Sequence, residues 1–356
     1  MSLILRQQKG SKLTISEMDG NLIYLDQIVS GLNYTFVKGK GSPSENGIEL
    51  QTAYHNAKLL TNLSENNIFT IIVAPGVYDL PTVIELDTPF INITSLTGDR
   101  DVILGRFDIM GDPLQIIGGG EDPIEVLNTS PCIVIKTDYT SIRGLVGKKY
   151  DSSNWNIIRS AIDSSENYYL PINIESKPPN EFEVGGPYEG VLIKNCQCGP
   201  FSFGSTDFMN GSVDIAANFS KCEAGSFSFN GHAYGLYEYC VAKHSSFSSG
   251  NSSFSSGKYL NCIGERNCFG SWGYSYGFYK QCEALENSFG AFGEVGGIYI
   301  ECSGGENSWY DGDLGVFEGH AERCRLFGSD FPTPSIHNSA IILCINGMNE
   351  IINKYY

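Results

Sequence analysis

The sequence predicts an all-β protein, a single-stranded parallel β-helix (solenoid) with N-terminal helical segments. The first observation is composition: 41 glycines in 356 residues, 12% aromatic and only 18% charged residues are typical of a turn-rich β protein. The second is a cysteine that recurs at intervals of 18 to 22 residues: Cys222, Cys240, Cys262, Cys282, Cys302, Cys324 and Cys344. The third is that other residue types keep the same register. A repeat of this length predicts a solenoid.

Three further series follow the cysteine register. Seven residues after a cysteine stands an aromatic residue: Phe203, Phe229, Phe247, Phe269, Phe289 and Trp309. Three residues before a cysteine stands another aromatic residue: Phe219, Tyr237, Tyr259, Tyr279 and Tyr299. Five residues after a cysteine stands an asparagine in three units: Asn267, Asn287 and Asn307. Leucine is too rare for a leucine-rich repeat, and helical repeats are longer. A unit of about 20 residues fits one coil of three short strands, each hydrogen-bonded to the next coil.

Equivalent side chains of such coils stack along the axis, so the repeat also predicts where they lie. The cysteine and aromatic series are expected in the core, and the asparagines at a left-handed turn where each amide bonds to its copies. Metal binding, disulfides and a reactive thiol are alternatives for the cysteines. We expect no metal and no cofactor, because histidines are few and only Cys196 and Cys198 lie close in sequence.

Ahead of the repeat, the chain divides into segments. Residues 13–36 read as an amphipathic helix with Leu22, Leu25, Ile28 and Val29 as its apolar stripe, which makes 1–36 a predicted docking segment. Residues 37–66 are a linker and a helix that covers the first coil. We expect the β-helix over 67–345 and a tail over 346–356.

The net charge of −17 disfavours nucleic acid and an anionic membrane as partners, since both need a basic surface. No stretch approaches 18 apolar residues, which disfavours a membrane span. The N-terminus does not resemble a secretory signal, so the cysteines are expected to be reduced thiols.

The block from Gly47 to Gly105 resembles the start of pectate-lyase-like right-handed β-helix proteins, including phage tailspikes. The resemblance rests on an amphipathic helix, a buried strand at Thr70–Val73, the turn "APGVYDL" and stacked β runs. The segment "KLTISEMDGNLIYL" is similar to an N-terminal stretch of many phage and virus structural proteins. It covers about 14 residues.

Together the two resemblances imply a virion structural protein, assembled in the host cytoplasm: a fibre, spike, or capsid or tail decoration. Residues 1–36 would then bind other virion proteins. Many β-helical spikes are trimers, so a homotrimer is a further expectation, although the sequence carries no marker for one. One alternative is a cellular β-helix that binds glycans or acts as a scaffold, in which 13–36 is a capping helix.

Carboxylates near the end of the repeat are the candidates for catalysis. β-Helical lyases and hydrolases cleave polysaccharides with paired acids in a groove. Asp311, Asp313 and Glu318 lie in "NSWYDGDLGVFEGH", where the coil is two residues longer than its neighbours. Ordinary turn chemistry explains these acids better, so the sequence leans against an enzyme.

Aromatic residues offer a second site, for host polysaccharide. Trp272, Tyr274 and Tyr276 alternate in "SWGYSYG", which places them on one face of a strand, and Tyr310 flanks the acidic loop. Such side chains can stack on sugar rings. The sequence favours the other orientation, in which the three alternating residues point into the core.

Overall fold

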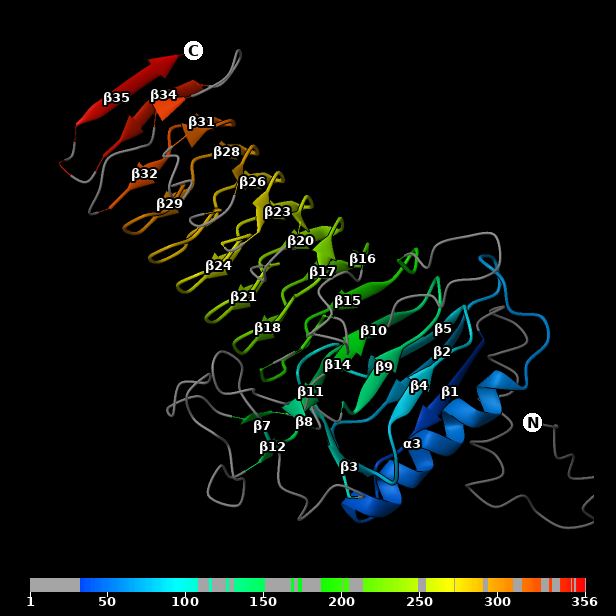
Figure 1. The fold of residues 1–356 in the computed structure, drawn as a ribbon. Coiled ribbons are helices and arrows are strands. Elements are labelled where there is room, and N and C mark those ends of the chain that lie inside the picture. The colour runs from blue at the N-terminus through cyan, green and yellow to red at the C-terminus, as the bar shows by residue number, and fades with distance from the viewer. Residues whose placement is uncertain are drawn as a thin grey trace, which may run out of the picture.

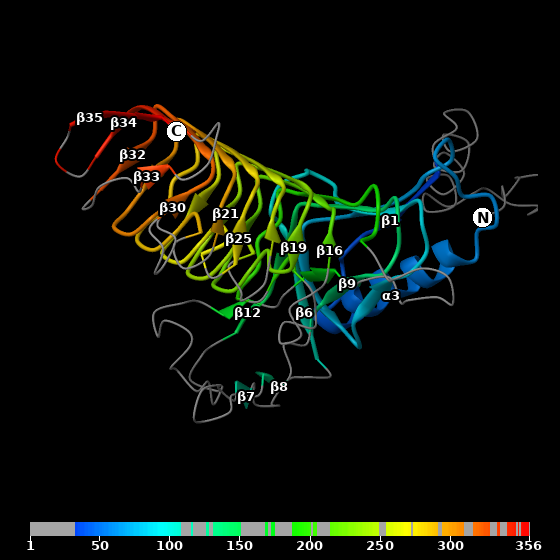
Figure 2. The ribbon, with the colours of Figure 1, turned by 45° about the horizontal axis from the view of Figure 1, so that its top comes forward.

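The residues that the structure describes form an elongated stack of short strands with helix α3 (Pro43–Lys58) at the N-terminal end, as Figure 1 and the turned view in Figure 2 show. This computed structural model describes residues 33–107, 115–116, 126–127, 131–150, 168–169, 172–174, 187–200, 202–204, 214–248, 254–271, 273–290, 294–309, 316–327, 333–334, 340–346, 348 and 350–355. The predicted docking residues Leu22, Leu25, Ile28 and Val29 lie outside these ranges.

One long sheet extends along the molecule, and its strands are parallel neighbours in chain order. In that order it contains β1 (Asn33–Val37), β2 (Phe69–Val73), β5 (Ile91–Ser95), β10 (Ser141–Arg143), β15 (Leu192–Lys194), β17 (Asn218–Ser220), β20 (Leu236–Glu238), β23 (Lys258–Leu260), β26 (Phe278–Lys280), β28 (Ile298–Ile300), β31 (His320–Glu322) and β34 (Ala340–Ile345). Each turn of the chain from β15 to β31 therefore adds one rung beside the previous one.

Two shorter parallel sheets complete the turns of the repeat. One is β16 (Asp214–Ile215), β19 (His232–Ala233), β22 (Phe254–Ser255), β25 (Tyr274–Ser275) and β27 (Glu294–Val295). The other is β18 (Glu223–Ala224), β21 (Val241–Ala242) and β24 (Ile263–Gly264). Near the C-terminal end, β30 (Val316–Phe317) pairs with β33 (Thr333–Pro334), and β29 (Ser303–Gly304) with β32 (Arg325–Leu326), which joins β34.

The N-terminal part repeats this parallel arrangement with longer strands. Its two sheets are β3 (Gly76–Leu80), β6 (Val102–Arg106) and β11 (Leu145–Gly147), and β4 (Ile84–Leu86), β9 (Ile133–Ile135) and β14 (Ile172–Ile174). Antiparallel pairs occur in β7 (Gln115–Ile116) with β8 (Val126–Leu127), and in β12 (Lys149–Tyr150) with β13 (Tyr168–Tyr169).

Helix α3 (Pro43–Lys58) lies against the first strands. Ser42 caps it: the Glu45 backbone N–H donates to the Ser42 hydroxyl, and the Glu45 carboxylate accepts from the Ser42 backbone N–H at 2.8 Å. Leu50, Tyr54 and Ala57 are buried against the strands, mainly β3. This is the helix that the sequence predicts within 37–66.

The core of the repeat consists of two aromatic columns. Phe247, Phe269, Phe289 and Trp309 stack with ring centroids 4.6–4.9 Å apart. Tyr237, Tyr259, Tyr279 and Tyr299 form the second column at 4.7–4.8 Å. Rings of the two columns meet edge to face, an arrangement that their quadrupoles favour. The prediction that the aromatic series fills the core is confirmed, since these rings are fully buried.

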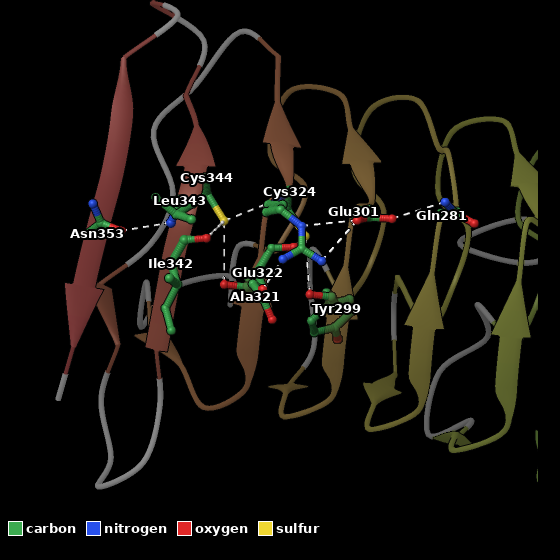
Figure 3. Close-up of polar contacts among 11 residues, drawn as sticks. Gln281, Tyr299, Glu301, Ala321, Glu322, Cys324, Ile342, Leu343, Cys344 and Asn353 are labelled. Atoms are coloured by element: carbon green, nitrogen blue, oxygen red, sulfur yellow. Dashed lines mark hydrogen bonds and ion pairs between the residues drawn. The ribbon is translucent and has the colours of Figure 1, made fainter.

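Cysteine thiols form a third buried column beside the rings, as predicted. All eleven cysteines are buried, and thiols donate to carbonyl groups, as Cys262 does to the Tyr237 carbonyl at 3.3 Å. Figure 3 shows the last rungs, where the Cys324 backbone N–H donates to the Cys344 sulfur at 3.3 Å. The left-handed turn is confirmed too, since Asn267, Asn287 and Asn307 have φ of 57°, 53° and 59°. The predicted amide ladder is confirmed only in part: the Asn307 amide donates to the Asn287 side-chain carbonyl at 3.1 Å, whereas the buried Asn267 side-chain carbonyl has no hydrogen-bond partner among the described residues.

The structure therefore confirms a mostly-β protein built of parallel strands. Two details differ from the predicted segments. Strand β1 belongs to the long sheet although it precedes residue 67, because Asn33–Val37 pairs in register with Phe69–Val73. The helix predicted over 13–36 is therefore wrong for its last four residues, which are strand. Strand β35 (Ile351–Tyr355) pairs antiparallel with β34, so part of the predicted tail covers the last sheet edge.

Candidate functional site

The outer surface of the sheet β16–β19–β22–β25–β27 carries a row of aromatic side chains. His232, Phe254 and Tyr274 occupy equivalent positions in successive rungs. Their rings stack, with centroids 4.9 Å apart from His232 to Phe254 and 4.5 Å from Phe254 to Tyr274. Because the strands are only two residues long, each presents one side chain outward here and one inward.

The direction of the Tyr274 and Tyr276 side chains differs from the one that the sequence favours. Tyr274 and Tyr276 do not point into the core. Ser275, which lies between them, is fully buried, and its hydroxyl is hydrogen-bonded to the Tyr279 hydroxyl at 3.0 Å. Strand alternation then places Tyr274 and Tyr276 outside, with their rings 5.8 Å apart. Trp272 lies outside the described residues.

A second outward row lies two residues after the first: Ala216, Tyr234, Ser256, Tyr276 and Gly296, followed by Glu318 on the next rung. Tyr234 is 51% exposed and Tyr276 39% exposed, high values for tyrosine side chains. The Glu318 backbone N–H donates to the Val295 carbonyl at 2.8 Å, which fixes Glu318 on the rung after β27. We call the two rows together the outer aromatic face: Asp214, Ala216, His232, Tyr234, Phe254, Ser256, Tyr274, Tyr276, Glu294, Gly296 and Glu318.

Tyr276 is held across two rungs of the outer aromatic face. Its ring covers Gly296, where a Cβ atom would stand 2.3 Å from the ring carbon Cε1. Its hydroxyl donates a hydrogen bond to the Glu294 carboxylate. Partial burial, this hydrogen bond and the nearby charges of Glu294 and Glu318 raise the pKa of Tyr276. Only glycine at position 296 leaves room for this ring.

Carboxylates flank both exposed tyrosines. Burial, and then the negative charge of Asp214, raises the pKa of Tyr234. Glu294 and Glu318 are exposed beside Tyr276. The outer aromatic face therefore combines apolar ring surface with hydrogen-bond acceptors and carries no lysine or arginine at its positions.

Of the predicted catalytic acids, the structure describes Glu318 alone. Asp311, Asp313 and Tyr310 lie outside the described residues, so their roles stay predictions. Glu318 is instead grouped with Glu294 and Tyr276. Among the described residues, no three His, Cys, Asp or Glu side chains are grouped so that they could hold a metal ion.

The repeat register contains the signal for the residues that the sequence analysis missed. Counting back eight residues from Cys240, Cys262, Cys282 and Cys302 gives His232, Phe254, Tyr274 and Glu294. Counting back six gives Tyr234, Ser256, Tyr276 and Gly296.

A separate row of polar side chains lies at a corner of the long sheet, away from the outer aromatic face. The Arg323 guanidinium contacts the Glu301 carboxylate at 3.0 Å, and the Gln281 amide donates to the same carboxylate at 3.1 Å. Figure 3 shows Glu301 and Gln281 on neighbouring rungs. These groups are exposed and paired with one another, so they stabilise the rungs weakly and form no site.

Comparison with known proteins adds little. No family model matches the chain, and no curated protein matches it. One solved structure, Geobacillus virus E2 ORF18, aligns with 89% of this chain at 11% identity and a TM-score of 0.31. The chain spans 64% of that protein's length. Among the described residues, no helix is both long and apolar enough to cross a membrane.

Proposed function

We propose that this protein is a virion structural component: a single right-handed parallel β-helix, of the pectin-lyase-like type, that serves as a fibre, spike, or capsid or tail decoration. It is assembled in the host cytoplasm and binds other virion proteins through residues 1–36, with Leu22, Leu25, Ile28 and Val29 as the contact stripe. Three such chains associating into a homotrimer belong to the same proposal.

The observation that carries the proposal is the continuity of the stack. From β15 to β31 every rung is hydrogen-bonded to the rungs on both sides, and the same residue types fill the same buried positions. A solenoid of this kind is held by contacts between neighbouring coils along its whole length. Both of its ends are covered, by α3 and by β35. Such a body suits a rigid, projecting part of a particle.

The segment at the N-terminus supports the location on a particle. "KLTISEMDGNLIYL" is similar to an N-terminal stretch of many phage and virus structural proteins, and it precedes the stack in the chain. In this proposal the segment attaches the protein and the stack projects from the particle.

Deletion of residues 1–32 tests the docking role, since the described structure begins after them. The shortened protein should keep the far-ultraviolet circular dichroism of the full chain but be missing from sedimented particles. Incorporation at the normal level would exclude this segment as the anchor. The matched control is Leu59→Ala, because Leu59 is exposed at the end of α3 and lies outside the segment.

A polysaccharide-cleaving spike is the second candidate, favoured by the two exposed carboxylates beside Tyr276. In that case the purified protein releases reducing ends or unsaturated products from a host polysaccharide. Loss of this release in Asp313→Asn or Glu318→Gln would assign the acid concerned.

A further inference from the structure

The outer surface of the long sheet carries lysines among apolar side chains in three successive rungs. Tyr259, Tyr279 and Tyr299 are buried in β23, β26 and β28, so strand alternation turns the residues on either side of them outward. These outward residues, which we call the lysine face, are Lys258, Leu260, Phe278, Lys280, Ile298 and Ile300. Both lysines are exposed, and neither forms an ion pair with a residue that the structure describes.

The same three rungs carry the opposite charge on the neighbouring sheet. There the outer aromatic face presents Phe254, Ser256, Tyr274, Tyr276, Glu294 and Gly296, followed by Glu318. The lysine face has no carboxylate in these rungs; Glu238 and Glu322 lie on the rungs that flank it, and Glu322 contacts Arg323. The cations and apolar side chains of one face therefore complement the carboxylates and rings of the other.

The two faces meet at a corner that carries no side chain. The corner residues of the three rungs are Gly257, Gly277 and Gly297. Because each coil passes from one face to the other across a single glycine, its two faces lie at nearly the same height along the stack. Two copies of the chain can therefore come close together at this corner.

A ring of copies around an axis parallel to the stack keeps equal rungs level, because cyclic symmetry has no shift along its axis. With the glycine corner at that axis, the residues next to the corner on the two faces lie opposite one another. Tyr276 of one copy then faces Phe278 of the next copy, and Tyr274 faces Lys280.

This arrangement gives Lys280 the partners that it lacks within its own chain. Its ammonium group lies over the Tyr274 ring and beside Glu294, which is the neighbour of Tyr274 on the next rung, about 4.8 Å away. Lys280 thus gains a cation–π contact and an ion pair, and the rings of Phe278 and Tyr276 pack together.

We propose that copies of this protein associate side by side, with the outer aromatic face of one copy against the lysine face of the next. The inference rests on the homotrimer of the proposed function for the number of copies, and it names the surfaces that hold the trimer together. The net charge of −17 opposes association at long range. Salt at physiological strength screens charges more than about 8 Å apart, so the shorter contacts between the two faces decide the outcome.

Sedimentation velocity of the purified full-length protein over a range of concentrations tests the proposal. The unmodified protein should sediment as a trimer. Glu294→Lys and Lys280→Glu should each raise the dissociation constant of the trimer at least tenfold, because each places like charges opposite one another. The double variant exchanges the two charges and should restore association.

Glu283→Lys is the matched control, because it makes the same charge change at an exposed residue outside both faces. It should associate as the unmodified protein does, and circular dichroism confirms that each variant is folded. A monomeric unmodified protein overturns the homotrimer and this interface together. A trimer that the single variants leave intact, that the double variant fails to restore, or that Glu283→Lys weakens equally overturns the interface alone. Incorporation into particles is measured separately, so either result leaves the virion role to its own test.

Discussion

The Tyr279 hydroxyl donates to the Ser255 hydroxyl of the preceding rung, 2.7 Å away in the core. Tyr299 repeats this bond to Ser275 at 2.8 Å. The series ends toward the N-terminus because the serine position is occupied by Ala233 and then Ile215. Among the residues that the structure describes, the Tyr237 hydroxyl consequently has no hydrogen-bond partner, although the side chain is fully buried.

Removing the hydroxyl group of Tyr237 and removing the equivalent group of Tyr279 should therefore change the free energy of unfolding in opposite directions. Tyr237→Phe removes a buried group with no partner, so the free energy of unfolding should rise by about 1 kcal/mol. Tyr279→Phe breaks bonds to Ser255 and should lower it by about 1 to 2 kcal/mol. Urea unfolding of both variants measures the difference. Equal losses would mean that the hydroxyl of Tyr237 is also bonded.

The buried thiols should react slowly in the native protein. Burial raises the pKa of Cys268 to about 12 and that of Cys196 to about 11, so these two thiols form little thiolate, the reactive form, at pH 8. For the other cysteines of the repeat the barrier is access, because their side chains are buried. Labelling with a thiol reagent should take place only as fast as the stack opens, and should be complete within minutes in denaturant. Fast labelling of Cys262, Cys282 or Cys302 without denaturant would contradict their place in the core.

The cap of α3 gives a pH-dependent prediction. Hydrogen bonds from the backbone and the hydroxyl of Ser42 lower the pKa of Glu45. Because the pKa of Glu45 is lower in the folded state, its ionised carboxylate stabilises the fold at pH values above the ordinary glutamate pKa. This stabilisation is lost as the pH falls through the folded-state pKa. Ser42→Ala should destabilise the helix by about 1 kcal/mol at pH 7 and by less in acid.

Hydrogen exchange of the α3 amides at pH 7 and pH 4 measures that effect. Ser44→Ala is the control, because Ser44 is exposed within the first turn and is not the capping residue. Equal exchange rates in the two variants would exclude the cap as a source of stability.

Left-handed backbone positions recur at each rung and allow a fourth prediction. The residue before each cysteine of the repeat has positive φ, 54° at Gln281 and 53° at Asn261 and Tyr239. A β-branched side chain is strained there, whereas asparagine adopts this conformation readily. Gln281→Val should lower the free energy of unfolding by about 1 to 2 kcal/mol, and Gln281→Asn should leave it unchanged or raise it. Thermal unfolding of the two variants measures the difference. Equal unfolding midpoints would contradict a left-handed backbone conformation at residue 281.

The core could be predicted because its residues are counted from a single register. Cysteine recurs in every unit, the aromatic positions recur in most units and asparagine in three, and stacked rungs give equivalent residues equivalent surroundings. The sequence places Tyr274 and Tyr276 on the wrong side of their strand, because two-residue strands give no long alternation to count. Ser275 decides their direction only through its hydrogen bond to Tyr279. The antiparallel return of β35 was not predicted, because a short C-terminal apolar run fits a tail as well as a strand.

The most direct test of the proposed function is mass spectrometry of purified, sedimented particles from the source culture, with this protein quantified against the major shell protein. The account predicts a fixed, substantial ratio that persists through repeated sedimentation. Recovery of the protein in the supernatant alone would contradict a virion role.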